Sequence, residues 1–464
     1  MIRILALLTA LALAGLLVAC TAMPPDPGSK AITAVPADDG RAVPDALLPP
    51  DSPAATPAQA SAISPSTTPA RQPDLWDRLV SGFAIPALDP ATPAGQRQAQ
   101  HLAWYRQRPE HLRRVFTRAR LYLHDIVQAT EAAGLPLEVA LLPAVESAFQ
   151  PKAVSSAAAD GLWQFIAPTG RRYDLKQHLF LDERRNPRAA TRAALRYLGD
   201  LRSRYGGDMQ LALAAYNCGE GCIDQALRRA QAQGSGRTFA DLRLNPETAQ
   251  YVPRLLALAQ VVHEAVRAPA AAREDLMASA GLPPLDDAPY FGTVELDRDI
   301  DLVLAARLAG LPLNEFMALN PQHRKPLIAA AAQQEILLPI DRIPLFERAV
   351  HQHKGPLASW SALRVQRTQP ARQLARELGW SLNNLLAVND IGTANRLIKA
   401  QSTLLVPRPP HRSAADIAEH VLESSWIATA PLPVAHKKTT RSVHGRHAKF
   451  GETASRQSPK TKAR

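Results

Sequence analysis

The chain has 464 residues, more than one hydrophobic core normally organises, and its 46% hydrophobic content excludes a wholly disordered protein. Forty prolines and only 5% aromatic residues indicate helical domains joined by unstructured segments. Three cysteines exclude a disulfide framework and a cysteine-rich zinc module, while the net charge of +12 would suit a polyanionic partner only if it lay on a folded surface.

The N-terminal segment has the features of an export signal. Its apolar run, residues 4–18, spans roughly 22 Å as a helix, less than the ~30 Å core of a bilayer. A cleaved signal peptide at 1–19 is therefore favoured over a transmembrane anchor. The run ends in Leu17-Val18-Ala19-Cys20, which resembles the lipobox of bacterial lipoproteins. The resemblance implies lipidation of Cys20, and Thr21 in place of Asp implies the outer membrane.

A long helical region follows a proline-rich segment. Residues 20–73 are mostly Pro, Ala, Ser and Thr without apolar periodicity, which predicts an extended tether. A helical extension is expected at 74–119 and the principal all-α domain at 120–267. Apolar residues at three- and four-residue steps predict one helix over 101–133. Further helices are predicted at 136–148, 187–205, 210–216, 223–233 and 246–267.

Beyond a joint rich in Pro and Ala, at 268–289, the pattern changes to an internal repeat. Two units, at 290–345 and 360–408, share the order strand, helix, helix, strand. Each has a glycine between its helices, Gly310 or Gly379, and an asparagine after the second helix, Asn320 or Asn389. The expected fold class is therefore mainly α: an all-α domain followed by small βααβ modules, with a disordered linker and tail.

One acidic residue stands out in an apolar helix. Residues 137–149 are apolar almost throughout but contain Glu146, and Pro151 discourages helix beyond Gln150. Glu146 is therefore expected in the last helical turn, where the helix dipole and apolar neighbours favour its protonated form. A carboxyl group that is protonated near neutral pH can act as a general acid. A surface glutamate at a frayed helix end is the alternative.

Three later segments carry side chains that suit a sugar-binding site. Gly161-Leu162-Trp163-Gln164-Phe165 joins aromatic and amide groups, which stack on and hydrogen-bond sugars. Ala214-Ala215-Tyr216-Asn217 ends a helix, and Tyr251 follows an expected Asn245 cap. Each segment also has a purely structural interpretation: Trp163 as core, Asn217 as helix terminator and Tyr251 as packing.

In their order along the chain, these motifs resemble one family. Glu146-Ser147, Gly161-Leu162-Trp163-Gln164, Ala215-Tyr216-Asn217 and Tyr251-Val252 resemble the successive motifs of the goose-lysozyme-like lytic transglycosylase family. Residues 140–149 resemble its membrane-bound lytic murein transglycosylase D type. The resemblance implies a lysozyme-like domain that cleaves the β-1,4 bond between N-acetylmuramic acid and N-acetylglucosamine in peptidoglycan. The product would be a 1,6-anhydromuramoyl end.

The resemblance also implies roles for individual residues. Glu146 would act as the catalytic acid and then as the base, with no partner acid, metal or organic cofactor. Five residues would bind or orient the substrate: Ser147, Gln164, Tyr216, Asn217 and Tyr251. A lysozyme-like hydrolase and a non-catalytic peptidoglycan-binding lipoprotein are the alternative functions.

Two cysteines depart from the family pattern. Cys218 and Cys222 flank Gly219-Glu220-Gly221 where relatives carry small and basic residues, and in an oxidising periplasm they could form a disulfide or remain free thiols. A metal site is not expected there, because two thiols without a nearby histidine are too few ligands.

The repeats and the tail give weaker indications of partners. The repeats resemble LysM modules, but Thr368-Gln369-Pro370 stands where LysM usually has Gly-Asp-Thr, and the first unit, at 290–345, is more divergent still. The fold is therefore better supported than glycan affinity. The tail at 431–464 has nine Lys and Arg against one acid, Glu452, and is expected to be disordered. It lacks interleaved aromatics, so nucleic acid is not expected. The tail could bind anionic lipid or the carboxylates of peptidoglycan, or it could be solvated without a partner. The expected partners are peptidoglycan glycan strands and, through the lipid anchor, a membrane.

Overall fold

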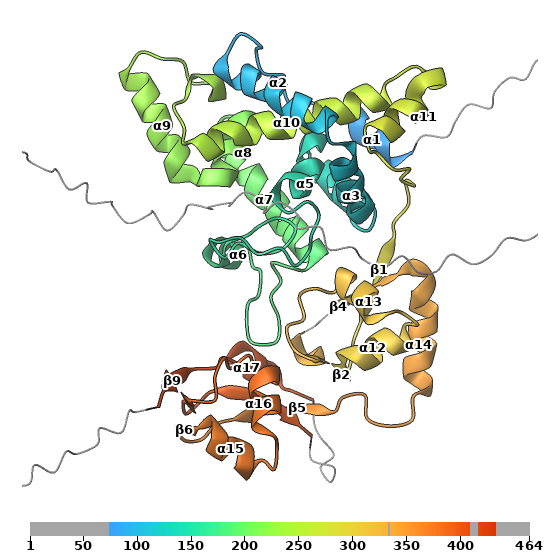
Figure 1. Ribbon diagram of the computed structural model, residues 1–464, viewed down its shortest axis with the longest axis vertical. Helices are drawn as coiled ribbons and strands as arrows, with labels where there is room; N and C mark the ends of the chain where they lie inside the picture. The colour runs from blue at the N-terminus through green and yellow to red at the C-terminus, as the bar shows by residue number, and fades with distance from the viewer. Residues whose placement is uncertain (1–73, 333–334, 409–415, 433–464) are drawn as a thin grey trace, which may run out of the picture.

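The computed structural model describes residues 74–332, 335–408 and 416–432. The expected signal peptide, Cys20, the tether and all but the first two residues of the basic tail lie outside the described residues. The described chain is mainly helical, with an all-α region followed by two small α/β units (Figure 1), which confirms the predicted fold class.

The all-α region runs from residue 74 to residue 285 and contains isolated β-bridges but no strand. Its helices are α1 (Leu75–Ser81), α2 (Pro93–Arg106), α3 (Pro109–Ala119), α4 (Leu123–Ala132), the 3-10 helix η1 (Leu137–Leu141), α5 (Leu142–Glu146), α6 (Ala167–Arg172), α7 (Pro187–Arg204), α8 (Met209–Cys218), α9 (Glu220–Ala232), η2 (Phe239–Asp241), α10 (Pro246–Val266) and α11 (Ala270–Ser279). They surround one hydrophobic core. In Figure 1, α2 lies alongside α10, the longest of these helices.

The prediction of one helix over 101–133 was wrong, because the chain breaks there twice. Pro109 occupies the first turn of α3, and the residue before a proline avoids the helical conformation, so Arg108 has φ −133° and α2 ends at Arg106. The second break lies between α3 and α4, where the Tyr122 hydroxyl donates to the carbonyl of Ala318 at 2.7 Å. Apolar periodicity continued across both breaks and could not reveal them.

The segment expected as an irregular joint contains a helix. α11 packs back on α10, and Arg273 on α11 pairs with Asp74 and with Asp77 at the start of the described chain. The indole nitrogen of Trp76 donates to the carbonyl of Pro283 at 2.8 Å. Residues 74–119 and 268–285 therefore share the core of the principal domain.

The first small unit has two short antiparallel strand pairs together with α-helices and 3-10 helices. β1 (Phe291–Glu295) pairs with β4 (Glu335–Pro339), and β2 (Ile300–Asp301) pairs with β3 (Leu327–Ile328). Its helices are α12 (Leu302–Leu308), α13 (Leu313–Leu319), η3 (Ala330–Ala332), η4 (Ile340–Arg342) and α14 (Ile343–Gln352). Within the described part of the chain no single helix has the length and apolarity to cross a membrane, and one bent pair, α12 with α13, meets that test by length and composition alone.

The second small unit repeats this plan and adds an edge strand. β5 (Trp360–Arg364) pairs with β8 (Thr403–Pro407), and β6 (Gln369–Pro370), β7 (Arg396–Ile398) and β9 (Thr429–Pro431) form a three-stranded sheet. Its helices are α15 (Ala371–Glu377), α16 (Leu382–Val388) and α17 (Glu419–Glu423). The sequence did not predict α14, α17, β9 or the short strands β2, β3, β6 and β7.

The glycine and asparagine that marked the repeat have the same structural role in both units. Gly310 and Gly379 have φ of 64° and 62°, the left-handed conformation that ends the first helix of each pair. The Asn320 amide nitrogen donates to the carbonyls of Phe316 and Leu337, and its oxygen accepts from the Leu337 nitrogen. Asn389 makes the same three bonds with Leu385 and Leu405. Each asparagine thus joins the second helix to the last strand.

A segment of the all-α region reaches the two small units. Residues 174–186, between α6 and α7, extend toward them as the green loop of Figure 1, and their main chain bonds to the first unit: Asp182 N donates to Gln322 O, and Arg324 N donates to Phe180 O, each at 2.9 Å. Phe180 is buried against Leu327 of the first unit and Leu405 of the second. The three parts are therefore in direct contact.

Candidate functional site

Glu146 is the last residue of α5 and is buried, with 5% of its surface exposed. The predicted helix over 136–148 is instead a 3-10 helix followed by the five-residue α5. After Ser147 the chain reverses through Ala148 and Phe149, both with positive φ (51° and 56°), a conformation that costs free energy for residues with a side chain. The Arg118 side chain donates to the Ala148 carbonyl at 2.8 Å, which supports this turn.

The Glu146 carboxylate is held by a tyrosine from α10. The Tyr251 hydroxyl donates to Glu146 Oε1 at 2.5 Å. Burial and the nearby charge of Glu146 raise the pKa of Tyr251 well above its usual value, so the hydroxyl keeps its proton. Tyr251 lies in the second turn of α10, which begins where the Asn245 side chain accepts from Thr248 N.

Ser147 and Gln164 shape a turn beside Glu146. The Ser147 hydroxyl donates to the Leu162 carbonyl at 3.0 Å, and the Gln164 amide nitrogen donates to the carbonyls of Gly161 and Ala153 at 2.8 and 3.0 Å. Gly161 has φ 83°, and a Cβ there would lie 2.0 Å from the Arg184 carbonyl, so only glycine fits. Both predicted binding residues therefore direct these donors into the protein.

Tyr216 supports the same turn from α8. Its hydroxyl donates to the Trp163 carbonyl at 2.8 Å, and burial with the charge of Glu146 raises its pKa well above the usual value. Trp163 is fully buried, and its indole nitrogen donates to the Thr191 hydroxyl at 2.9 Å. The suggestion that Trp163 stacks on a sugar was therefore wrong, and its structural interpretation as core is correct.

Asn217 follows Tyr216 and is bonded to a residue that the sequence analysis gave no role. The Thr248 hydroxyl donates to Asn217 Oδ1 at 2.7 Å, whereas Asn217 Nδ2 has no hydrogen-bond partner among the described residues, although the side chain is only 1% exposed. Thr248 lies three residues before Tyr251, and that spacing puts both side chains on one face of α10. This spacing could have identified Thr248 as a further residue of the site.

Cys218 and Cys222 form a disulfide in the structure, with their Cα atoms 5.9 Å apart. Cys218 ends α8, Gly219 turns the chain with φ 88°, and Cys222 lies in the first turn of α9. The bond thus joins two helices directly after Tyr216 and Asn217. Within the described residues no three His, Cys, Asp or Glu side chains are grouped as metal ligands.

Glu146 is thus a buried glutamate at the end of a short helix inside an all-α domain, and two family models match parts of the chain. Residues 126–238 match the family model of the transglycosylase SLT domain, and residues 290–354 match that of the lytic transglycosylase MltD, LysM-like domain. The chain therefore carries an SLT domain followed by an MltD-type LysM-like domain. The second match falls on the repeat unit that departs further from the usual LysM pattern.

Individual relatives cover parts of the chain. Membrane-bound lytic murein transglycosylase D from Escherichia coli K12 is 32% identical over 295 residues, which are 64% of this chain and 60% of that protein, and the protein of the same name from E. coli O6:H1 gives the same values. A putative tributyltin chloride resistance protein from Alteromonas sp. strain M-1 is 38% identical over 122 residues, 26% of this chain and 59% of that protein. The chain thus spans about 60% of the length of these curated relatives.

One solved structure is also similar. It is an inactive mutant of the lytic transglycosylase Slt from Pseudomonas aeruginosa, with 25% sequence identity and a TM-score of 0.26. The match covers 31% of this chain and 24% of that chain.

Proposed function

We propose that this protein is a peptidoglycan lytic transglycosylase, and that Glu146 is its catalytic residue. The observation that carries the proposal is the buried Glu146 carboxylate, which accepts a hydrogen bond from Tyr251 within an SLT domain. The names of the curated relatives, lytic murein transglycosylases, support the same reaction. Among the proposed site residues, Glu146 alone has a carboxyl group, which suits a reaction that needs one acid-base group.

The proposed reaction uses that group twice. Protonated Glu146 gives its proton to the glycosidic oxygen between N-acetylmuramic acid and N-acetylglucosamine, and the bond from this oxygen to the muramoyl C1 breaks. The Glu146 carboxylate then takes the proton of the muramoyl C6 hydroxyl, whose oxygen bonds to C1. The muramoyl end becomes a 1,6-anhydro ring, Glu146 is protonated again, and no water is consumed. Most glycosidases instead use two carboxylates.

The geometry supports different roles for the other site residues. Tyr251 orients the Glu146 carboxylate, and Ser147, Gln164 and Tyr216 act as positioning residues that hold the turn at 161–165 beside it. Asn217 differs from these three, because its buried amide nitrogen has no hydrogen-bond partner among the described residues while Thr248 fixes its oxygen. We assign this nitrogen to a substrate group that enters the site.

The test is the chemistry of the products released from purified sacculi. The protein without residues 1–20 is incubated with sacculi beside Glu146→Gln, and the muropeptides are analysed by mass spectrometry. We expect 1,6-anhydro ends from the wild type and a loss of more than about 1,000-fold in rate with Glu146→Gln, since general acid and base catalysis each contribute ~10²–10⁴-fold. Reducing ends, heavier by one water, would identify a lysozyme-like hydrolase.

Glu138→Gln is the matched control for that experiment. Glu138 is a second buried glutamate of the same segment, and its carboxylate accepts from the backbone nitrogens of Ala84 and Ile85. It therefore supports the fold rather than the reaction, and its variant is expected to lower stability but to retain the anhydro products. If the wild type binds sacculi but never cleaves them, the proposed reaction is wrong and the protein is a non-catalytic peptidoglycan-binding protein.

We also propose that the chain works in the cell envelope, with lipidated Cys20 anchoring it to the periplasmic face of the outer membrane. The lipobox-like Leu17-Val18-Ala19-Cys20 supports this placement, as does the name of the relatives, membrane-bound lytic murein transglycosylase D. The tether at 20–73 would then separate the anchor from the SLT domain, and the units at 290–345 and 360–408 would contact glycan. Cys20→Ser is expected to move the protein from the membrane fraction to the soluble fraction after cell fractionation.

A further inference from the structure

The turn at 161–165, part of the proposed site, is held by a buried arginine from another part of the chain. Arg184 belongs to the segment at 174–186 that leads into α7. Its guanidinium Nη1 donates to the Ala158 carbonyl at 2.9 Å, just before the turn, and to the Phe165 carbonyl at 3.2 Å, at its end. One side chain therefore joins the two ends of the turn.

The same guanidinium is oriented by a carboxylate whose backbone is bonded to the first small unit. Asp182 accepts from Arg184 Nε and Nη2 at 2.9 and 2.7 Å, a pairing of two parallel bonds that fixes the plane of the guanidinium. Asp182 is buried, and its backbone nitrogen donates to the Gln322 carbonyl at 2.9 Å. Two residues earlier, Phe180 is buried against residues of both small units. The small units thus hold the carboxylate that orients Arg184.

A second arginine of the segment binds the residue before the turn. Arg185 Nε and Nη2 donate to the two carboxylate oxygens of Asp160 at 2.8 and 2.9 Å. Asp160 is buried, and its backbone nitrogen donates to the Phe165 carbonyl at 3.0 Å, which closes the turn. Two neighbouring arginines therefore bind both the carbonyls and the carboxylate around the turn.

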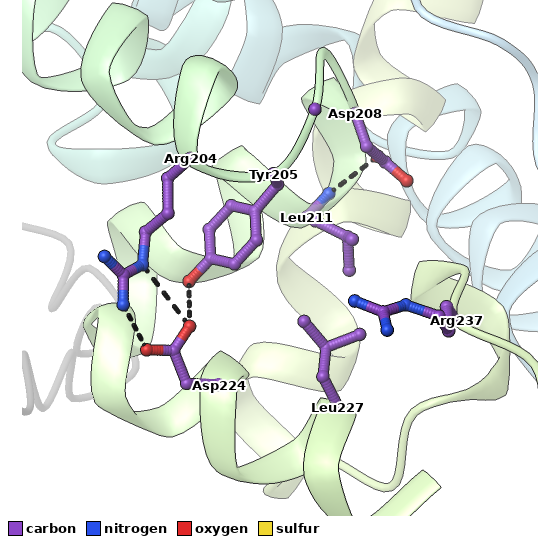
Figure 2. A pocket seen from close by; sticks show the side chains of 8 residues that line it. Arg204, Tyr205, Asp208, Leu211, Asp224, Leu227 and Arg237 are labelled. Atoms are coloured by element: carbon purple, nitrogen blue, oxygen red, sulfur yellow. Dashed lines mark hydrogen bonds and ion pairs between the residues drawn. The ribbon is translucent and has the colours of Figure 1, made fainter. Parts of the chain in front are cut away.

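Other arginine–carboxylate pairs of the all-α region join helices to one another. Arg204, at the end of α7, pairs with Asp224 on α9 beside a cavity of about 570 Å³ (Figure 2). Arg273 on α11 pairs with Asp77 on α1. Arg184 differs from both, because its bonds join the turn at the site to a segment that the small units hold.

We propose that Arg184 is a positioning residue for the reaction at Glu146, and that the small units fix it through Asp182. The inference rests on the proposed function, because it concerns the geometry of the same site. Arg184 holds the turn at 161–165, and a carbonyl of that turn accepts from the hydroxyl of Ser147, which follows Glu146 in the chain. The rate of cleavage therefore depends on the docking of the small units as well as on the groups that touch the substrate.

The first test is Arg184→Lys. This variant keeps a positive charge beside Asp182, but a single ammonium group cannot reproduce the planar fork that binds a carboxylate and two carbonyls together. On soluble glycan strands we expect kcat for the anhydro product to fall about tenfold, with KM within about twofold of the wild-type value. A small displacement of the acid slows the chemical step more than it weakens substrate binding.

Arg273→Lys is the matched control, because the two arginine side chains are similarly buried, 13% exposed for Arg273 and 11% for Arg184. It should lower the free energy of unfolding by a similar amount and leave kcat unchanged. Arg185→Lys is a second, milder probe of the turn, since that side chain is 25% exposed, and its kcat should fall about threefold.

A double-mutant cycle tests the part played by the small units. Phe180→Ala removes the ring that anchors the segment at 174–186 to both units, and we expect kcat to fall severalfold. If both residues act through one route, the variant that combines Phe180→Ala with Arg184→Lys is no slower than Arg184→Lys alone. Losses that multiply in the combined variant, or a wild-type kcat in Phe180→Ala, overturn the link to the small units.

Hydrogen exchange separates this inference from the proposed reaction, because it needs no turnover. We expect the amides of residues 158–166 to exchange about tenfold faster in Arg184→Lys and in Phe180→Ala than in the wild type, and at the wild-type rate in Arg273→Lys. Unchanged exchange in Arg184→Lys, or a loss of kcat equal to that of Arg273→Lys, overturns the role of Arg184. If the wild type forms no anhydro product while this exchange pattern holds, only the reaction is overturned.

Discussion

At the residue scale, the Tyr251 hydroxyl is a strong donor that orients the Glu146 carboxylate. Tyr251→Phe removes this bond and leaves the ring in place. We expect kcat for anhydro product to fall about 10- to 100-fold with little change in KM, because the group that moves the proton is no longer held in the productive direction. Steady-state kinetics on solubilised strands measures the effect.

Tyr122→Phe is the comparison for that variant. Tyr122 is also buried, but its hydroxyl donates to the carbonyl of Ala318 in the first small unit and not to Glu146. Its loss is expected to lower the free energy of unfolding by about 1 kcal/mol and to leave kcat unchanged. If kcat falls equally in Tyr251→Phe and Tyr122→Phe, the effect comes from the loss of any buried hydroxyl and not from the orientation of Glu146.

Glu146 could be singled out from the sequence because two local features coincide: a carboxyl group near the end of an apolar helix, and Pro151 just beyond it. The sequence could not show that Ser147, Gln164 and Tyr216 turn their donors onto backbone carbonyls, because those carbonyls belong to Gly161, Leu162 and Trp163 in a turn with unusual φ angles. The choice between a sugar ligand and a backbone carbonyl is made by tertiary geometry.

At the element scale, the disulfide fixes the junction of α8 and α9 next to Asn217. Replacement of both cysteines by serine is expected to lower the free energy of unfolding by no more than about 2 kcal/mol, because the bond closes a very short loop. We expect kcat to fall severalfold, or KM to rise severalfold, while the fold is kept, since the bond directly follows Asn217. Urea unfolding and steady-state kinetics measure the two effects separately.

A reducing agent provides the control for the cysteine variant. Dithiothreitol should reproduce the double variant in the wild type and have no effect on the double variant itself. If reduction leaves wild-type kinetics unchanged while mass spectrometry shows both thiols free, the junction does not depend on the bond.

The positions of the elements were predicted better than their ends. Helices α7, α8, α9 and α10 begin and end within about three residues of the predicted ranges, because Asn, Asp or Gly caps and prolines mark their ends. The predicted helix over 101–133 failed at Arg108 and at Tyr122, where apolar spacing continues through the break. β9 and α17 were missed because their partners, β7 and η3, are remote in sequence or weakly patterned.

At the scale of the whole molecule, a buried histidine lies where the all-α region meets the first small unit. His323 forms a β-bridge with Leu181, and burial lowers its pKa to about 3. The unfolded chain takes up this proton below about pH 6.5, whereas the folded chain does so only near pH 3, so stability is expected to fall as the pH falls through this window. From pH 7.5 to pH 5.0 the loss from this residue is roughly 2 kcal/mol.

His323→Gln isolates this contribution. The free energy of unfolding, measured in urea at pH 7.5 and pH 5.0, should fall by about 2 kcal/mol less in the variant than in the wild type. His178, whose pKa burial lowers to about 4, acts in the same direction and remains in both proteins. Equal losses in the two proteins would contradict the assignment to His323.

The contacts of Phe180 limit how the chain can be shortened. Its side chain is 1% exposed because Leu327, Ala358 and Leu405 of the small units cover it, although it belongs to the segment between α6 and α7. Truncation after residue 285 would place this ring in water and remove the main-chain partners of Phe180 and Asp182. An isolated SLT domain would consequently be less soluble, and its segment at 174–186 would be less ordered. A low rate measured on that isolated domain would result from the missing contacts of this segment rather than from weaker binding of glycan by the small units.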